Sequence, residues 1–390
     1  MAAAPGPFHH RSRSPGPRRR TTPCAASGRR PPSRRPPPPP PRGGPPARAP
    51  PAGEPTQAPP GCAPPAGHGS GGGDASGDGG SDVEPTTLSL VGFAVPKAGN
   101  DAAQELWGET EDGQGVTWET SYGASGDQSR AVADGLEADY VHFSLEGDVT
   151  RLVDAGLVAE DWNAGENQGI VSQSVVVLVV REGNPKNIQS WEDIVQPGVE
   201  IVTPNPGSSG SARWNILAGW GSVIANGGSE EDATEYLRKF FTNAVALPGS
   251  GRDATTAFTS GTGDVLLSYE NEAILARQNG ETFDYVVPDQ TLLIENPAAV
   301  TVDADPKAQS YLDFVLTPEG QEAFAHVGFR PLTGDVDFEV EGANDPSDPF
   351  PTVPTLLTIA DDFGGWSATN DKFFGDEGLV TKIQAETGKQ

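Results

Sequence analysis

The chain has 390 residues and a formal net charge of −28, because 54 Asp and Glu outnumber 26 Lys and Arg. Residues 81–390 hold 51 of these acids but only 15 of the bases, so this part carries −36 and would repel phosphates; we expect no nucleic-acid partner. It has no Cys and two His, His142 and His326, which disfavours zinc enzymes and Ser-His-Asp hydrolases. We expect no metal ion and no cofactor.

Residues 1–82 differ in composition from the rest of the chain. Residues 1–73 are mostly Pro, Arg, Gly, Ala and Ser and contain no Leu, Ile, Val or Trp, so we predict that they are disordered. A Gly/Asp/Ser-rich tether follows. No signal peptide is recognisable, although Cys62 and the tether resemble the region after a lipoprotein cysteine. One hypothesis is that residues 1–73 reflect a misassigned start or reading frame.

From residue 87 onward, short apolar runs alternate with helical patterns, which predicts an α/β protein with mostly parallel sheets. The length favours two lobes, and no segment approaches 18 consecutive apolar residues. We predict strands at residues 88–95, 115–120, 138–144, 172–184, 200–203, 264–268, 283–288 and 292–302. Helices are predicted to start at Ser125, after Ser211 and at Ser229, and to occupy residues 148–155, 271–278, 306–316 and 318–327.

Three strand-to-helix junctions are rich in serine and glycine: SYGASGDQ (121–128), PGSSGSARW (206–214) and PGSGRDATTAF (248–258). A helix start exposes unpaired backbone N–H groups and the positive end of the helix dipole, and is therefore suited to an anion. The alternative is that each serine only caps its helix. Ser125 with Gln128 has the spacing of such a capping box. The sequence alone does not show that the three junctions converge.

The motifs TPNPGSSGSARWN, SYGASGDQ, GDVLLSYENEA and LTPEGQEAFAHVGFRP, together with FGGW at 363–366, closely resemble the sulfate- and thiosulfate-binding proteins of bacterial ABC uptake systems. The resemblance covers residues 88–374. It implies a periplasmic-type fold with parallel sheets in each lobe, helices on both faces, and hinge strands between lobes. We expect residues 83–165 to form the first part of lobe 1, 166–274 to form lobe 2, and 275–390 to complete lobe 1 and add a C-terminal segment.

The resemblance also implies a set of ligand-binding residues. Tyr269 stands where the family has a tryptophan that donates its indole N–H, and Ala94 stands near the position of a family aspartate. Asp148 and Arg213 align with a family salt bridge, and Arg252 is expected to lend its amide and to pair its guanidinium with a carboxylate at the rim. Glu270 and Glu272 are expected to be first-turn helix acids. The expected ligand residues are Ser125 (hydroxyl and amide), Ser209, Gly210, Ser211, Gly251 and Tyr269, supported by Gly126, Asp148, Arg213 and Arg252.

We therefore expect a non-catalytic, monomeric, extracytoplasmic protein that captures sulfate or thiosulfate between its lobes and delivers it to ABC permease subunits in the membrane. It would be periplasmic or held at the cell surface, with lipid anchoring as one option. A binding protein for molybdate or tungstate would differ in cleft size. An enzyme acting on a phosphorylated or sulfated substrate would show turnover, but the chain has no GxxxxGK[ST] loop. A sensor domain that binds the anion and signals to a partner is a further alternative.

Overall fold

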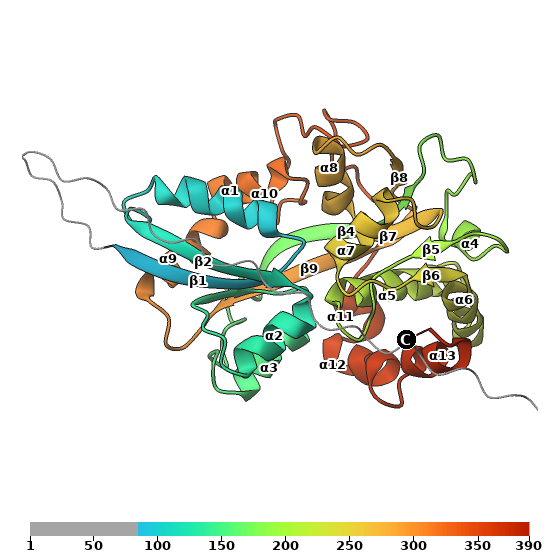
Figure 1. Cartoon of the computed structure of the whole chain (residues 1–390), viewed down its shortest axis with the longest axis horizontal. Helices are drawn as coiled ribbons and strands as arrows, with labels where there is room; N and C mark the ends of the chain where they lie inside the picture. Colours follow the sequence, from blue (N-terminus) through green and yellow to red (C-terminus); the bar gives the residue numbers. More distant parts are fainter. Residues whose placement is uncertain (1–84, 390) are drawn as a thin grey trace, which may run out of the picture. The chain divides into compact units, whose positions relative to one another are not determined.

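A computed structural model describes residues 85–389. The predictions made for residues 1–82 lie outside the described residues. Ten strands belong to one sheet, with the order β2-β1-β3-β9-β4-β7-β5-β6; β8 pairs with β4 and β10 with β9 (Figure 1). The strands are β1 (Thr86–Phe93), β2 (Val116–Gly123), β3 (Tyr140–His142), β4 (Ile170–Val180), β5 (Ile201–Val202), β6 (Ala244–Ala246), β7 (Val265–Tyr269), β8 (Asp284–Val286), β9 (Gln290–Val300) and β10 (Thr355–Leu357).

The sheet has two halves joined by its two longest strands. Within the β1–β3 half all pairs are parallel, and so are the pairs of β5 with β6 and β7. Every antiparallel pair of these strands involves β4 or β9: the two pair with each other, β9 also pairs with β3, and β4 also pairs with β7 and β8. The predicted α/β class with mostly parallel strands is confirmed. The proposed lobe boundaries stay a prediction, with β4 and β9 as the candidate hinge strands.

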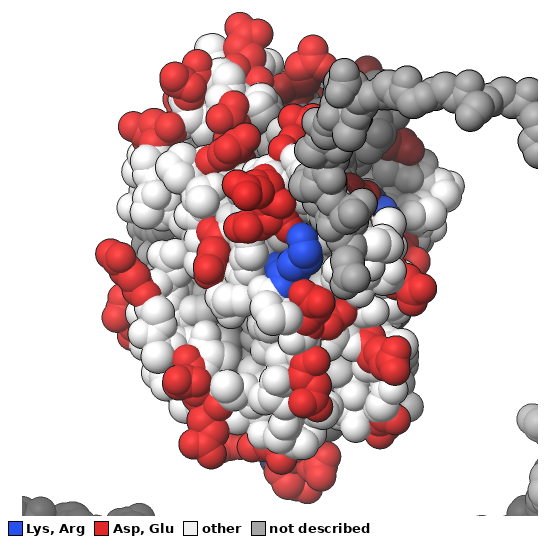
Figure 2. Space-filling model, turned by 90° about the vertical axis from the view of Figure 1, so that its left-hand side faces the viewer, with Lys and Arg blue, Asp and Glu red and all other residues white. Residues whose placement is uncertain are grey.

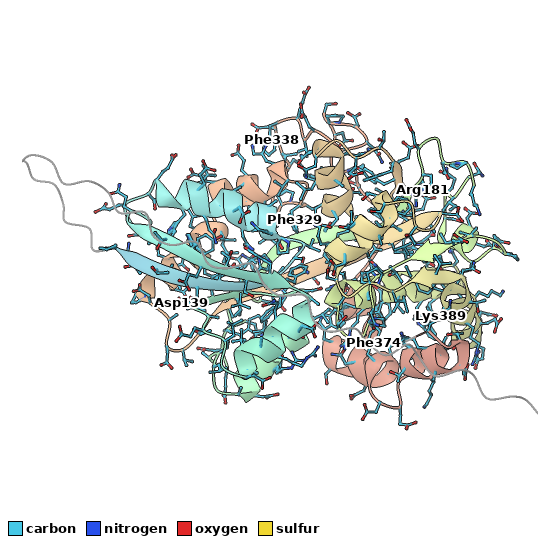
Figure 3. The ribbon with its side chains drawn as sticks, viewed as in Figure 1. Asp139, Arg181, Phe329, Phe338, Phe374 and Lys389 are labelled. Carbon is cyan, nitrogen blue, oxygen red and sulfur yellow. The ribbon has the colours of Figure 1, made fainter. Side chains whose placement is uncertain are left out.

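Helices cover both faces of the sheet. Helices α9 and α10 pack against α1 beside the β1–β3 half, whereas α13 packs against α6 beside the β5–β7 half. Lys389 Nζ donates to the Ala244 carbonyl at 2.6 Å, so the end of the described chain is tied to β6 (Figure 3). The helices are α1 (Lys97–Gly108), α2 (Ser125–Ala133), α3 (Glu146–Asp154), α4 (Trp191–Ile194), α5 (Gly210–Ala225), α6 (Glu230–Asn243), α7 (Gly251–Thr259), α8 (Glu270–Gln278), α9 (Pro306–Val315), α10 (Pro318–His326), α11 (Ile359–Phe363), α12 (Trp366–Thr369), the π-helix η1 (Asn370–Phe374) and α13 (Leu379–Thr387).

Local sequence explains several of these elements. Apolar residues recur at helical spacing in α6 from Ala233 to Phe241, and the face that they form is buried. Its start carries the predicted cap, because the Ser229 hydroxyl accepts the Asp232 amide and the Asp232 carboxylate returns to Ser229. The capping box predicted at Ser125 is wrong: Ala124 is the cap residue of α2, and the Ser125 hydroxyl bonds elsewhere.

The surface of the described part is strongly acidic. Figure 2 shows Asp and Glu spread over one face, with few Lys and Arg among them. No helix within residues 85–389 combines the length and apolarity needed to cross a membrane.

Candidate functional site

The starts of α2, α5 and α7 meet at one place. The Gly126 amide at the start of α2 donates to the Ser208 carbonyl, just before α5, at 3.2 Å. The Ser208 hydroxyl in turn donates to the Gly249 carbonyl, just before α7, at 2.8 Å. A methyl group on Gly251 would lie 3.0 Å from Ser211 Oγ, so these two helix starts touch. The three junctions that the sequence singled out therefore converge.

Each of these starts leaves backbone N–H groups unpaired. The first amides of a helix have no partner within it. Among residues 85–389, no hydrogen bond outside the helix is made by the amides of Ser125, Gly210, Ser211, Gly251 or Arg252. Each helix adds partial positive charge at the same end. The result is a cluster of uncharged donors that faces a shared space, which is an arrangement that suits an anion.

The Ser125 side chain plays a different part from the predicted one. Its hydroxyl donates to Asp148 Oδ2 at 2.6 Å and accepts the Ser144 amide at 2.9 Å. A carboxylate can only accept, so the single hydroxyl hydrogen of Ser125 is already in use. In this arrangement Ser125 can offer an anion its amide but not its hydroxyl. The hydroxyl contact is therefore left out of the proposed contacts, and the amide contact stays a prediction.

The hydroxyls of the other serines differ in whether they cap a helix. Ser209 is the cap residue of α5, is 3% exposed and makes no side-chain capping bond. Ser211 is equally buried and its hydroxyl faces Tyr269. Ser250 instead caps α7 by accepting the Asp253 amide at 3.1 Å. The simple capping interpretation is thus correct for Ser250. At the start of α5 the Ser209 hydroxyl makes no capping bond, whereas the Ser211 hydroxyl lies within hydrogen-bonding reach of Tyr269.

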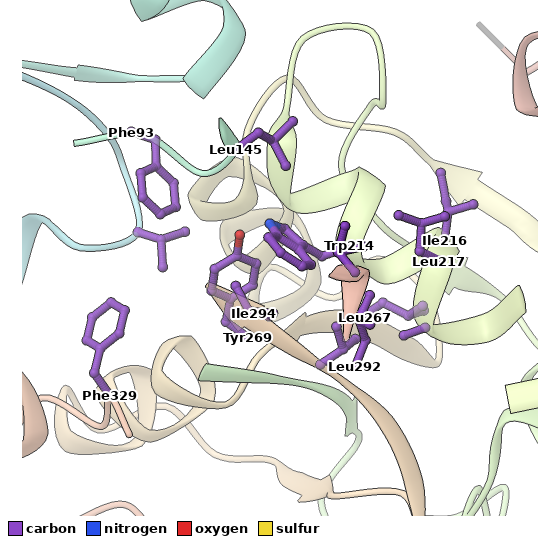
Figure 4. Close-up of a cluster of buried hydrophobic side chains, with 14 of the residues drawn as sticks. Phe93, Leu145, Trp214, Ile216, Leu217, Leu267, Tyr269, Leu292, Ile294 and Phe329 are labelled. Carbon is purple, nitrogen blue, oxygen red and sulfur yellow. The ribbon is translucent and has the colours of Figure 1, made fainter. Parts of the chain in front are cut away.

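Tyr269 lies at the end of β7 and is 1% exposed. Its hydroxyl shares a hydrogen bond of 2.8 Å with Ser144 Oγ, and Trp214 Nε1 approaches the same oxygen at 3.2 Å. Figure 4 shows the phenol oxygen and the indole nitrogen directed toward one another near Leu145. Burial holds the pKa of Tyr269 well above its usual value, so the phenol stays protonated and can donate.

Two residues near the site were missed by the sequence analysis. Ser144 follows β3 at its carboxyl end, a position where parallel strands commonly present ligand-binding groups. Val95 follows β1 in the same way: its amide has no partner among the described residues, and its side chain lies 3.2 Å from a methyl placed on Gly251. Ala94, by contrast, donates its amide to the Gly123 carbonyl at 2.9 Å. Their positions, directly after the carboxyl ends of β3 and β1, were the signal that could have revealed both residues.

The predicted ion pair between Asp148 and Arg213 is not formed. Asp148 pairs with Arg151 of the same helix at 2.9 Å. Arg213 donates to Asn370 Oδ1 at 2.8 Å and to the Pro206 carbonyl at 3.3 Å. Arg151 lies one turn from Asp148 and reaches it at no cost to the helix. Burial lowers the pKa of Arg213, and the nearby Asp148 carboxylate opposes that shift. Both residues line a small cavity of about 20 Å³ between α2, α3 and the start of α5.

The other charged groups near the site are paired away from it. Arg252 forms two hydrogen bonds with Glu272, at 2.6 and 3.1 Å, so it pairs with a carboxylate as predicted, but this carboxylate is buried and not at the rim. Glu270 is fully buried and pairs with Arg330 at 2.7 and 3.1 Å. Both glutamates lie in the first turn of α8, as expected.

At the far end of α7, Arg181 donates to the carbonyls of Phe258, Thr262 and Gly263, which fixes this helix on β4 (Figure 3).

Comparison with known proteins gives consistent results. The family of bacterial extracellular solute-binding proteins matches residues 93–330. A sulfate-binding protein of Synechococcus elongatus is 44% identical over 328 residues, which cover 80% of this chain and 91% of that protein. A thiosulfate-binding protein of Pseudomonas aeruginosa is 35% identical over 295 residues, 73% of this chain and 86% of that protein.

Solved structures agree with this result. The sulfate-binding protein SubI from Mycobacterium tuberculosis has 44% sequence identity and a TM-score of 0.69, over 74% of this chain and 99% of that one. A periplasmic thiamin-binding protein, 16% identical with a TM-score of 0.58, shares the fold alone. The family match spans more than half of the chain, and these relatives are named as binding proteins. The chain therefore belongs to the bacterial extracellular solute-binding protein family.

Proposed function

We propose that this protein captures sulfate, or its close relative thiosulfate, in the space shared by α2, α5 and α7, and delivers it to ABC permease subunits in the membrane. It acts outside the cytoplasm as a monomer and catalyses no reaction. The observation that carries the proposal is the convergence of unpaired amides from three helix starts. The names of its relatives, sulfate- and thiosulfate-binding proteins, support the choice of anion.

The binding mechanism relies on neutral donors. A dianion that leaves water needs many hydrogen bonds, because its dehydration is costly. Amides at helix starts supply them in fixed directions and add the helix dipole, without a buried Lys or Arg in contact with the anion. The proposed contacts are the amides of Ser125, Gly210, Ser211 and Gly251 and the hydroxyls of Ser209, Ser211 and Tyr269. Gly126, Asp148, Arg213 and Arg252 support them.

Closure of the two sheet halves completes the site in this proposal. The contact between Gly126 and Ser208 joins the helix after β2 to the loop before α5, and that between Ser144 and Tyr269 joins the loop after β3 to the end of β7. These contacts must break for an anion to enter. The strands β4 and β9 run between the halves and are where the chain would bend.

Selectivity against phosphate follows from protonation. Sulfate carries no proton at neutral pH, whereas phosphate usually keeps one and needs an acceptor. The Asp148 carboxylate, a candidate acceptor that lines the small cavity beside the start of α5, is engaged with Ser125 and Arg151. A bound phosphate would leave its proton facing other donors, an unpaired arrangement that costs about 1–3 kcal/mol or more.

Calorimetric titration of the full chain with sulfate, thiosulfate, molybdate and phosphate, in parallel, tests the proposal. We expect sulfate or thiosulfate to bind at least about 5- to 150-fold more tightly than phosphate, which corresponds to the cost of that unpaired proton. Tightest binding of molybdate would instead support a molybdate or tungstate carrier, and turnover of a sulfate ester would support an enzyme. Failure of all four anions to bind would refute the proposed site. Export to the cell surface is checked separately, by fractionation of cells that produce the chain.

A further inference from the structure

Ser144 makes more contacts across the candidate site than any residue that the sequence analysis named. It is fully buried, and its amide donates to Ser125 Oγ at 2.9 Å. Its carbonyl accepts Trp214 Nε1 at 3.0 Å and Asn296 Nδ2 at 3.1 Å. These backbone bonds link the loop after β3 to α2, α5 and β9. They fix the Ser144 backbone whatever side chain stands there.

The Ser144 hydroxyl has two partners of its own. Trp214 Nε1 lies 3.2 Å from the oxygen, and an indole N–H can only donate, so it uses one lone pair of Ser144. The Tyr269 hydroxyl lies 2.8 Å away, and either of the two hydroxyls can be the donor. Two hydroxyl hydrogens therefore serve this pair: one is shared between the oxygens, and one remains for another acceptor.

The acidity of the two groups decides which hydrogen remains. A phenol is intrinsically more acidic than an aliphatic alcohol and is therefore the stronger hydrogen-bond donor. With an anion nearby, the favourable order is from Ser144 to Tyr269 and from Tyr269 to the anion, because each hydrogen bond polarises the next. We infer that Ser144 is a positioning residue that directs the Tyr269 hydroxyl at the bound anion. This inference rests on the proposed function.

The experiment is a double-mutant cycle read by calorimetric titration with sulfate, using the full chain and the variants Ser144→Ala, Tyr269→Phe and the double variant. We expect Ser144→Ala to weaken sulfate binding about fivefold to tenfold in the wild-type background, the effect of one hydrogen bond. In the Tyr269→Phe background it should change binding less than twofold, since no phenol is left to direct.

Ser222→Ala is the matched control. Ser222 is also a buried serine, but its hydroxyl donates to the Gly219 carbonyl within α5. Ser222 lies roughly 18 Å along the helix from Gly210, since α5 rises by about 1.5 Å per residue. We expect unchanged sulfate binding for this variant. Equal weakening by Ser144→Ala in both backgrounds would show a merely structural role and overturn the inference. So would an unchanged affinity in the wild-type background. If the unsubstituted chain bound no sulfate, the proposed function would fail as well.

Discussion

Gly210, at the start of α5, faces the loop after β3 at very close range. A Cβ at this position would lie 2.5 Å from Ser144 Oγ, 2.6 Å from Ser144 Cβ and 2.9 Å from Leu145 Cγ. Carbon atoms at rest lie about 3.5–4.0 Å apart. An added methyl group must therefore push the two elements apart by roughly 1 Å. Gly210 is in the helical conformation, and alanine would otherwise favour the helix by about 1 kcal/mol.

The Gly210→Ala substitution should therefore act on closure rather than on folding. Overpacking of this kind costs about 1–3 kcal/mol, which corresponds to a loss of roughly 5- to 150-fold in sulfate affinity. Without sulfate the halves can relax apart, so we expect the melting temperature of the free protein to move by only about 2 °C. Calorimetric titration and thermal unfolding measure the two quantities.

Gly147→Ala serves as the control for this substitution. Gly147 also lies in the first turn of a helix, α3, and a methyl there would meet its nearest atom, Asn370 Nδ2, at 3.5 Å, an ordinary contact. We expect it to bind sulfate like the unsubstituted chain. A Gly210→Ala variant that binds sulfate within about threefold of the wild type would refute the reasoning. A loss of stability as large as the loss of affinity would do the same.

Three further predictions concern charge. Ser209→Glu should abolish sulfate binding, measured by calorimetry, because it places a like charge among the donors, whereas Ser209→Ala should weaken it only about tenfold. Burial lowers the pKa of His142 to about 3, so this imidazole stays neutral and sulfate affinity should be nearly constant between pH 5 and 8. The unfolded chain takes up a proton on His142 that the folded chain does not, so His142 should lower stability in urea by about 1.4 kcal/mol per pH unit between about pH 6.5 and about pH 3. His142→Gln should remove this contribution. Arg330→Ala leaves the carboxylate of the fully buried Glu270 without a partner and should cost about 3–5 kcal/mol in urea unfolding, whereas an exposed pair such as Lys372–Glu230 should tolerate the same change.

Much of the fold could be predicted because local patterns agree with it. The apolar spacing of residues 233–241 gave α6, and the alternation of strands and helices gave the α/β class. Pattern alone could not give the sheet order, in which β9 lies between β3 and β4. That order depends on pairings between residues far apart in sequence, such as Tyr140 with Val300. No local signal carries such information.

In the candidate site, too, local features could be predicted from the sequence and long-range contacts could not. Serine and glycine at helix starts were visible in the sequence, and the structure brings them together. The partners of each side chain were not visible. Asp148 was expected to pair with Arg213 but has a nearer cation, Arg151, on its own helix. Ser125 was assigned a ligand hydroxyl whose hydrogen goes to that same carboxylate. Such choices depend on how the side chains are placed in three dimensions, and motif spacing does not fix them.

The acidic surface has a consequence for the rate of capture. A sulfate ion must approach a protein that is also negatively charged, since residues 81–390 carry a net charge of −36. The helix dipoles attract it only over about one turn, whereas the repulsion extends over a Debye length, about 10 Å at 0.1 M salt and about 3 Å at 1 M. Added sodium chloride should therefore accelerate association in stopped-flow measurements, the reverse of ordinary electrostatic steering. A protein with this charge distribution therefore binds its anion faster at high salt than at low salt.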